Sequence, residues 1–70
     1  MSTNTSDSSS KLKKIAVLAL GYQQYEVHGC YPKGSRQPSH YRICEAGQLK
    51  HDWRDVDTFP SHRTLRRLFD

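Results

Sequence analysis

The sequence predicts a small α+β fold, in which an antiparallel sheet of three to four strands has one C-terminal helix packed on one face. Two observations lead to this fold class. Residues 22–31 and 40–46 alternate between apolar and polar side chains, which is the period of two of a β-strand. Near the C-terminus, apolar residues recur instead at helical spacing, at Leu65, Leu68 and Phe69.

Residues 1–10 are predicted to be a disordered N-terminal tail, and residues 11–70 a single α+β domain. The segment MSTNTSDSSS contains seven Ser or Thr residues and no apolar side chain after Met1. Such a segment buries too little apolar surface to offset the entropy of ordering it. A domain of the remaining size buries only about 60% of its extended-chain surface, so we expect marginal stability.

The segment KKIAVLAL, residues 13–20, fits either a strand or a helix. Ser10 is a suitable helix cap, Gly21 a suitable helix end, and some apolar residues between them fall at helical spacing. A strand is indicated by the uninterrupted apolar run IAVLAL, which contains β-branched residues and ends at a glycine. We favour the strand, because such a run suits a central strand better than one face of a short surface helix.

Residues 25–31 and 40–46 are predicted to form a hairpin around the loop PKGSRQPS, whose prolines, glycine and serines are typical of a connection. We expect Tyr31 to pair with Tyr41, with Gly29 opposite Ile43 and Val27 opposite Glu45. A slip by one residue would mix the apolar set with the polar one. The apolar face then contains Tyr25, Val27, Tyr31, Tyr41 and Ile43, and the polar face contains His28, Cys30, His40, Arg42 and Cys44.

The rest of the chain is predicted to add a turn, a short strand and the helix. EAGQ fits a turn in which Gly47 takes a positive φ, and LKHDW, residues 49–53, fits a returning strand. Pro60 ends any strand before Ser61, which is a good N-cap for a helix that continues to Phe69. The apolar side of this helix is expected to pack on the sheet.

The four residues His28, Cys30, His40 and Cys44 have the ligand atoms of a tetrahedral zinc site. On a strand, however, His40 and Cys44 would be about 13 Å apart. The strand and the four-ligand site therefore exclude each other, and we predict no metal and no cofactor. A nucleophilic Cys44 activated by His28 would need a pocket, for which so small a domain has little volume. We expect the protein not to be an enzyme.

The net charge of +4 favours an acidic partner. We predict a small basic binding or regulatory protein that contacts nucleic acid, DNA or RNA, through the hairpin loop and one helix face. The alternative is a protein-binding inhibitor or adaptor, comparable to small viral or phage regulators, that docks on an acidic face of a larger protein. The candidate binding residues are Lys33, Arg36 and Arg42 on the loop side, and Arg63, Arg66 and Arg67 on the helix.

The only apolar run, IAVLAL, is shorter than the roughly 20 residues of a membrane span. It also lacks the longer apolar core and the cleavage site of a signal peptide. These features predict a cytoplasmic protein without a membrane contact, in which Cys30 and Cys44 are free thiols.

Overall fold

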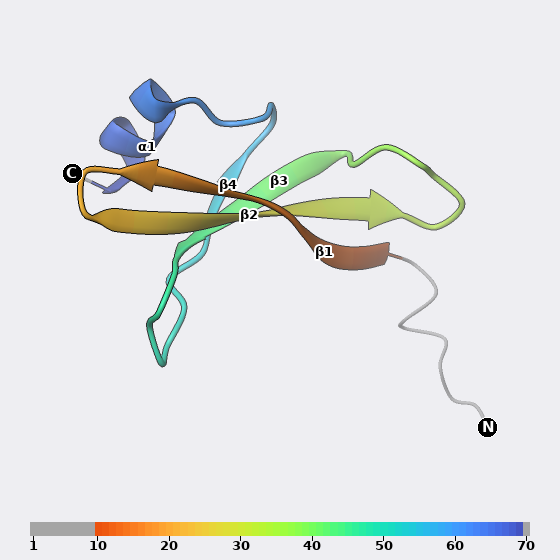
Figure 1. Cartoon of the computed structure of the whole chain (residues 1–70). Coiled ribbons are helices and arrows are strands. Elements are labelled where there is room, and N and C mark those ends of the chain that lie inside the picture. The colour runs from red at the N-terminus through yellow and green to blue at the C-terminus, as the bar shows by residue number, and fades with distance from the viewer. Residues whose placement is uncertain (1–9, 70) are drawn as a thin grey trace.

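The computed structural model describes residues 10–69, which form a four-stranded antiparallel sheet and one helix (Figure 1). Each strand pairs with the next one along the chain, so the order in the sheet is β1-β2-β3-β4. The predicted fold class is confirmed. The predicted tail lies outside the described residues, except for Ser10, with which β1 begins. The elements are β1 (Ser10–Leu20), β2 (Gln23–Pro32), β3 (His40–Glu45), β4 (Arg54–Val56) and α1 (His62–Phe69).

Residues 10–20 form a strand, as we favoured, but β1 lies at the edge of the sheet and not at its centre. Its pairing with β2 has a register shift between Lys14 and Ala16, which marks a β-bulge. Gly21, with φ of 63°, makes the turn into β2. The apolar run is therefore covered only in part: Leu18 packs against the core, whereas Val17 is 51% exposed.

The hairpin of β2 and β3 forms as predicted, but its register differs by two residues. Val27 pairs with Ile43 and Gly29 with Tyr41, so the predicted pairing of Tyr31 with Tyr41 is wrong. A shift by two residues keeps every side chain on its predicted face. The observed register is favoured because it places two fully buried aliphatic side chains, Val27 and Ile43, directly opposite each other.

The fourth strand is Arg54–Val56, and the predicted strand at residues 49–53 is wrong. Residues 49–53 belong to the β3–β4 connection, which begins at the predicted turn with Gly47 at φ of 83°. Leu49 is fully exposed there and has nothing to pack against. Val56, in contrast, pairs with Tyr41 and packs against the core, so burial selects the later segment.

Helix α1 begins after Ser61, which caps it as predicted. The hydroxyl oxygen of Ser61 accepts a hydrogen bond from the backbone N–H of Thr64 at 3.3 Å, and its carbonyl oxygen accepts one from Leu65 at 3.0 Å. Within residues 10–69 the helix is the only one and has eight residues. No helix in this part of the chain is long and apolar enough to cross a membrane.

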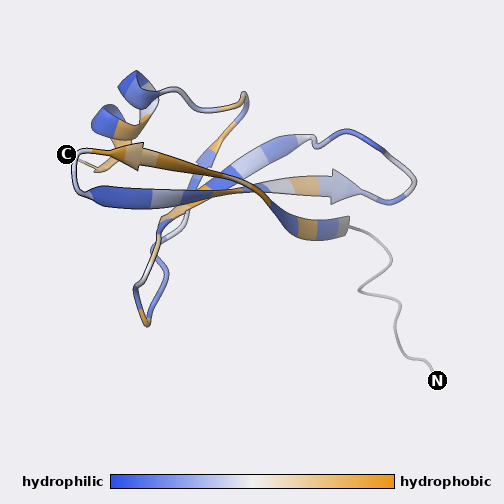
Figure 2. Cartoon of the chain, viewed as in Figure 1, coloured by the Kyte–Doolittle hydropathy of each residue, from blue (hydrophilic) through white to orange (hydrophobic). Residues whose placement is uncertain are grey.

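The core lies between α1 and one face of the sheet. Leu65 is fully buried there against Tyr25 and Ile43, as the helical spacing predicted. The ring of Phe69 stacks at a tilt on Tyr25, with centroids 4.7 Å apart. Figure 2 shows the hydrophobic residues of α1 and of the second half of β1 close together. The partly buried residues around this cluster are Leu18, Leu20, Val56, Leu68 and Phe69.

Candidate nucleic-acid interface

The pairing of β1, β2 and β3 brings together two stretches of sequence that lack acidic residues. Residues 8–25 and residues 27–44 contain no Asp or Glu, so Glu26 is the only acid between positions 8 and 44. Because β1 and β3 both pair with β2, their basic residues lie on one part of the sheet. We call this part, together with the β2–β3 loop, the basic end. Its cations are Lys11, Lys13, Lys14, Lys33, Arg36 and Arg42.

Lys33 and Arg36 lie on the exposed β2–β3 loop, which is the predicted position. Gly34, with φ of 80°, turns the chain beside Lys33. At the base of the loop, the backbone N–H of Ser39 donates to the carbonyl oxygen of Cys30 at 2.9 Å. A backbone hydrogen bond thus closes the loop, and the side chains of Lys33 and Arg36 are exposed to solvent.

Arg42 differs from the two loop cations because it is paired with an acid. Its Nε donates to Oδ1 of Asp55 at 2.9 Å, across the pairing of β3 with β4. Its guanidinium carbon lies 5.3 Å from the centre of the Trp53 ring. Part of its charge is therefore already balanced, and we expect it to contribute less to a phosphate contact than Lys33 or Arg36.

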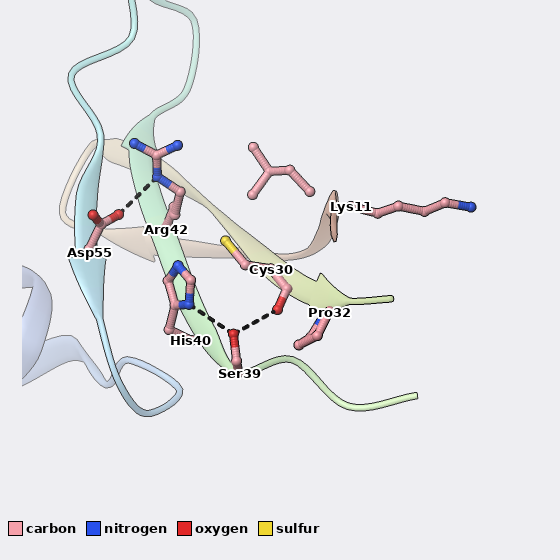
Figure 3. Close-up of a pocket in the computed structure, with 8 residues that line it drawn as sticks. Lys11, Cys30, Pro32, Ser39, His40, Arg42 and Asp55 are labelled. Atoms are coloured by element: carbon pink, nitrogen blue, oxygen red, sulfur yellow. Dashed lines mark hydrogen bonds and ion pairs between the residues drawn. The ribbon is translucent and has the colours of Figure 1, made fainter. Parts of the chain in front are cut away.

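A pocket of about 350 Å³ is lined by residues of all four strands (Figure 3). Its residue Arg42 precedes the core residue Ile43 on β3, so the pocket lies on the sheet face away from α1. His40 and Arg42 bring cationic or hydrogen-bonding groups to it, and Ser39 Oγ lies 2.9 Å from Nδ1 of His40. Lys11 belongs to the lining, although its side chain extends away from the other residues in Figure 3. The complete lining consists of Lys11, Leu12, Cys30, Pro32, Ser39, His40, Arg42 and Asp55.

The helix arginines are not part of the same surface. Figure 1 shows α1 beside the β1–β2 turn, at the opposite end of the sheet from the β2–β3 loop. His62 fixes the start of the helix there, since its Nε2 donates to the carbonyl oxygen of Ala19 at 2.9 Å. Three exposed arginines follow on the outside of the helix, as predicted, namely Arg63, Arg66 and Arg67. The six predicted binding residues therefore lie on two separate basic surfaces, at opposite ends of the sheet.

A second group of side chains gathers on the sheet face away from α1. The observed register sets Glu26 opposite Cys44, and His28 follows Glu26 by two residues on the same face. Nε2 of His28 lies 3.0 Å from Oε1 of Glu26, and the Cys44 thiol donates weakly to the same oxygen at 3.9 Å. Cys44 is fully buried. The predicted alternation places all three residues on this face, but the sequence analysis did not consider Glu26 as a candidate ligand.

Contacts within this group shift two pKa values in opposite directions. The hydrogen bond with His28 lowers the pKa of the Glu26 carboxyl, and the positive charge of Lys14 adds to the effect. Burial raises the pKa of the Cys44 thiol, and the negative charge of Glu26 raises it further. A buried, protonated thiol is the opposite of the exposed thiolate of a nucleophilic cysteine.

Sequence reasoning missed Trp53, which the β3–β4 connection carries back onto this face. Its ring meets His28 edge to face, with centroids 4.9 Å apart, and lies 5.4 Å from the ring of His51. A single Trp in a polar segment was a visible signal, because an indole ring seldom stays fully in solvent. Trp53 is half-buried here.

The four-ligand zinc set considered from the sequence does not come together. His40 and Cys44 lie four residues apart on β3, and His40 pairs with Cys30 at the pocket. The two cysteines are separate free thiols. Among the described residues, the metal-ligating side chains that converge are those of Glu26, His28 and Cys44.

Compared with known proteins, the chain matches no family model, no curated protein and no solved structure. Its function is therefore inferred from the charges, contacts and burial of its own residues.

Proposed function

We propose that this protein is a small, non-enzymatic binding protein that contacts nucleic acid through the basic end of its sheet. The observation that carries the proposal is the alignment of two acid-free stretches by strand pairing. It brings six cations together with Glu26, the only acid between positions 8 and 44, while Asp55 of β4 pairs with Arg42. Phosphate backbones bind such surfaces by releasing condensed counterions. We place the binding in the cytoplasm.

Lys33 and Arg36 are the primary contacts in this proposal. Both are exposed on the loop, and neither has an acidic partner among the ion pairs found in residues 10–69. The adjoining pocket offers donors from His40 and Arg42 that suit a phosphate oxygen or a base edge. The arginines of α1 form a second, separate contact for a strand long enough to run along the sheet.

The test is binding of fluorescently labelled DNA and RNA oligonucleotides to the full chain, measured by anisotropy from about 50 to 200 mM salt. We expect the logarithm of the binding constant to fall linearly with the logarithm of the salt concentration. Lys33→Ala and Arg36→Ala are each expected to weaken binding and to reduce the salt slope by about 1. Lys50→Ala, which removes one exposed cation from the β3–β4 connection, is the matched control and is expected to change neither.

Absence of binding at low salt overturns the proposal. The alternative, an inhibitor or adaptor that docks on an acidic protein face, then becomes the working hypothesis. A loss in Lys50→Ala equal to that in Lys33→Ala would instead show that the contact is not localised at the basic end, which also contradicts the proposal.

A further inference from the structure

We propose that Glu26, His28 and Cys44 form a binding site for one Zn²⁺ ion on the sheet face away from α1. The ion would be held by one carboxylate oxygen, by Nε2 of the imidazole and by the thiolate sulfur, with water in the fourth position. This site is separate from the basic end and does not depend on the proposed nucleic-acid contact.

The distances among the three ligand atoms fit a zinc ion. All three atoms lie within 4.8 Å of one another, with 3.0 Å from His28 Nε2 to Glu26 Oε1 and 3.9 Å from Cys44 Sγ to the same oxygen. Ligands at 2.0–2.3 Å from a tetrahedral ion are separated by about 3.3 to 3.7 Å. Each of these two separations therefore needs to change by only a few tenths of an ångström.

The sheet holds these residues in place before any metal binds. Glu26 and Cys44 are direct partners in the antiparallel pairing of β2 with β3, and His28 follows on the same face. The rings of Trp53 and His28 pack edge to face, and this contact restricts the orientation of the imidazole. Preorganised ligands lose little conformational entropy on binding, so three residues on paired strands can hold an ion that three flexible side chains cannot.

The chemistry of the ligand set selects zinc over the harder divalent ions. A thiolate and an imidazole favour Zn²⁺, whereas Mg²⁺ and Ca²⁺ prefer sites made of oxygen atoms. Binding releases the proton of the Cys44 thiol to solvent. The charges of the carboxylate and the thiolate then balance that of the ion, which suits a site where Cys44 is fully buried.

A zinc ion would also compensate for the small core of this chain. Among the described residues, the buried apolar side chains are those of Tyr25, Val27, Ile43, Cys44, Pro60 and Leu65. Domains of this size often gain stability from a metal or a disulfide, and the two cysteines here are unpaired. A metal on the face opposite α1 would stabilise the side of the sheet that the helix leaves uncovered.

The test uses the full chain without an affinity tag, reduced and freed of metal, and titrated with Co²⁺ and then with Zn²⁺ as competitor. We expect one equivalent of Co²⁺ per chain, with a thiolate-to-cobalt charge-transfer band that Zn²⁺ removes. Glu26→Gln, His28→Asn and Cys44→Ser are each expected to weaken Zn²⁺ binding by more than the 10–100-fold typical of outer-sphere partners. Cys30→Ser and His40→Asn are the matched controls and are expected to bind as the parent chain does.

Two results would overturn the proposal: no charge-transfer band at stoichiometric Co²⁺, or a loss of affinity in Cys30→Ser or His40→Asn equal to that in Cys44→Ser. Circular dichroism of the metal-free variants shows which of them fold. Glu26 and His28 are partly exposed, so their variants report on the site even if substitution of the buried Cys44 disrupts the sheet. Loss of zinc binding with intact binding of oligonucleotides separates this site from the proposed function.

Discussion

Gly29 of β2 stands directly opposite Tyr41 of β3, at a point where the chain has no room for a larger residue. A Cβ atom at position 29 would lie 2.9 Å from Cε1 of Tyr31, 3.2 Å from Cβ of Pro38 and 3.4 Å from Cδ1 of Ile15. The β2–β3 loop, through Pro38, and the bulge of β1, through Ile15, thus both approach β2 at this residue. The absence of a side chain at Gly29 allows all three contacts.

Gly29→Ala is expected to lower the free energy of unfolding by about 1–3 kcal/mol, the usual cost of overpacking. An alanine at a strand position without strain would instead stabilise slightly, by restricting the unfolded chain. The sign of the effect therefore reports whether Tyr31 and Pro38 are in place. Urea unfolding followed by circular dichroism measures it, and a gain in stability would contradict the packing described here.

Leu65→Ala is expected to lower the free energy of unfolding by about 2–5 kcal/mol, because it removes most of a fully buried side chain between α1 and the sheet. In a domain of marginal stability, this loss leaves much of the chain unfolded. Arg66→Ala, at the next and exposed position of the same helix, is the control and is expected to change stability by less than about 0.5 kcal/mol. Similar midpoints for the two variants in a urea titration would show that α1 does not pack on the core.

The free energy of unfolding is expected to decrease at acidic pH, where Glu26 becomes protonated. Its pKa is lowered from 4.5 by the hydrogen bond with His28 and by the charges of Lys14, His28 and His51, while partial burial opposes the shift. Cys44 faces the same carboxylate as an uncharged thiol. A lowered folded-state pKa contributes stability above the unfolded value of 4.5, and this contribution is lost as the pH falls through the folded value.

Urea unfolding of the metal-free chain between about pH 6 and pH 3 measures this contribution. Glu26→Gln is expected to flatten the decline below pH 4.5, because glutamine does not titrate. Asp52→Asn, at an exposed carboxylate paired with Arg54, is the matched control. If the free energy of unfolding of the parent chain and of Glu26→Gln fell in parallel with pH, the Glu26–His28 contact would not be the source of the acid-sensitive stability.

Much of this fold could be predicted from short-range pattern. The alternation in β2 and β3 assigns each side chain to the correct face, and the spacing of Leu65, Leu68 and Phe69 identifies the buried side of α1. Both patterns reflect the residue spacing within one strand or one helix, so they can be recognised without knowing which elements pack against it. The cap at Ser61 is predictable for the same reason.

What could not be predicted depends on how elements meet. A two-residue change of register leaves both faces unchanged, so hydrophobic pattern cannot distinguish the predicted pairing from the observed one. The error matters for the site, because only the observed register sets Glu26 opposite Cys44. The return of Trp53 onto His28 and the separation of the loop cations from the helix arginines are likewise consequences of tertiary packing.

The position of β1 has a consequence for how the protein behaves at high concentration. An eleven-residue strand at the edge of a sheet, with Leu12, Ile15 and Val17 between 38% and 51% exposed, is a template on which another chain can assemble into fibrils. Two features counter this: the bulge after Lys14 interrupts a flat edge, and three lysines repel an identical strand. The positive charge of β1 is therefore expected to oppose pairing of this edge with a second copy of the chain.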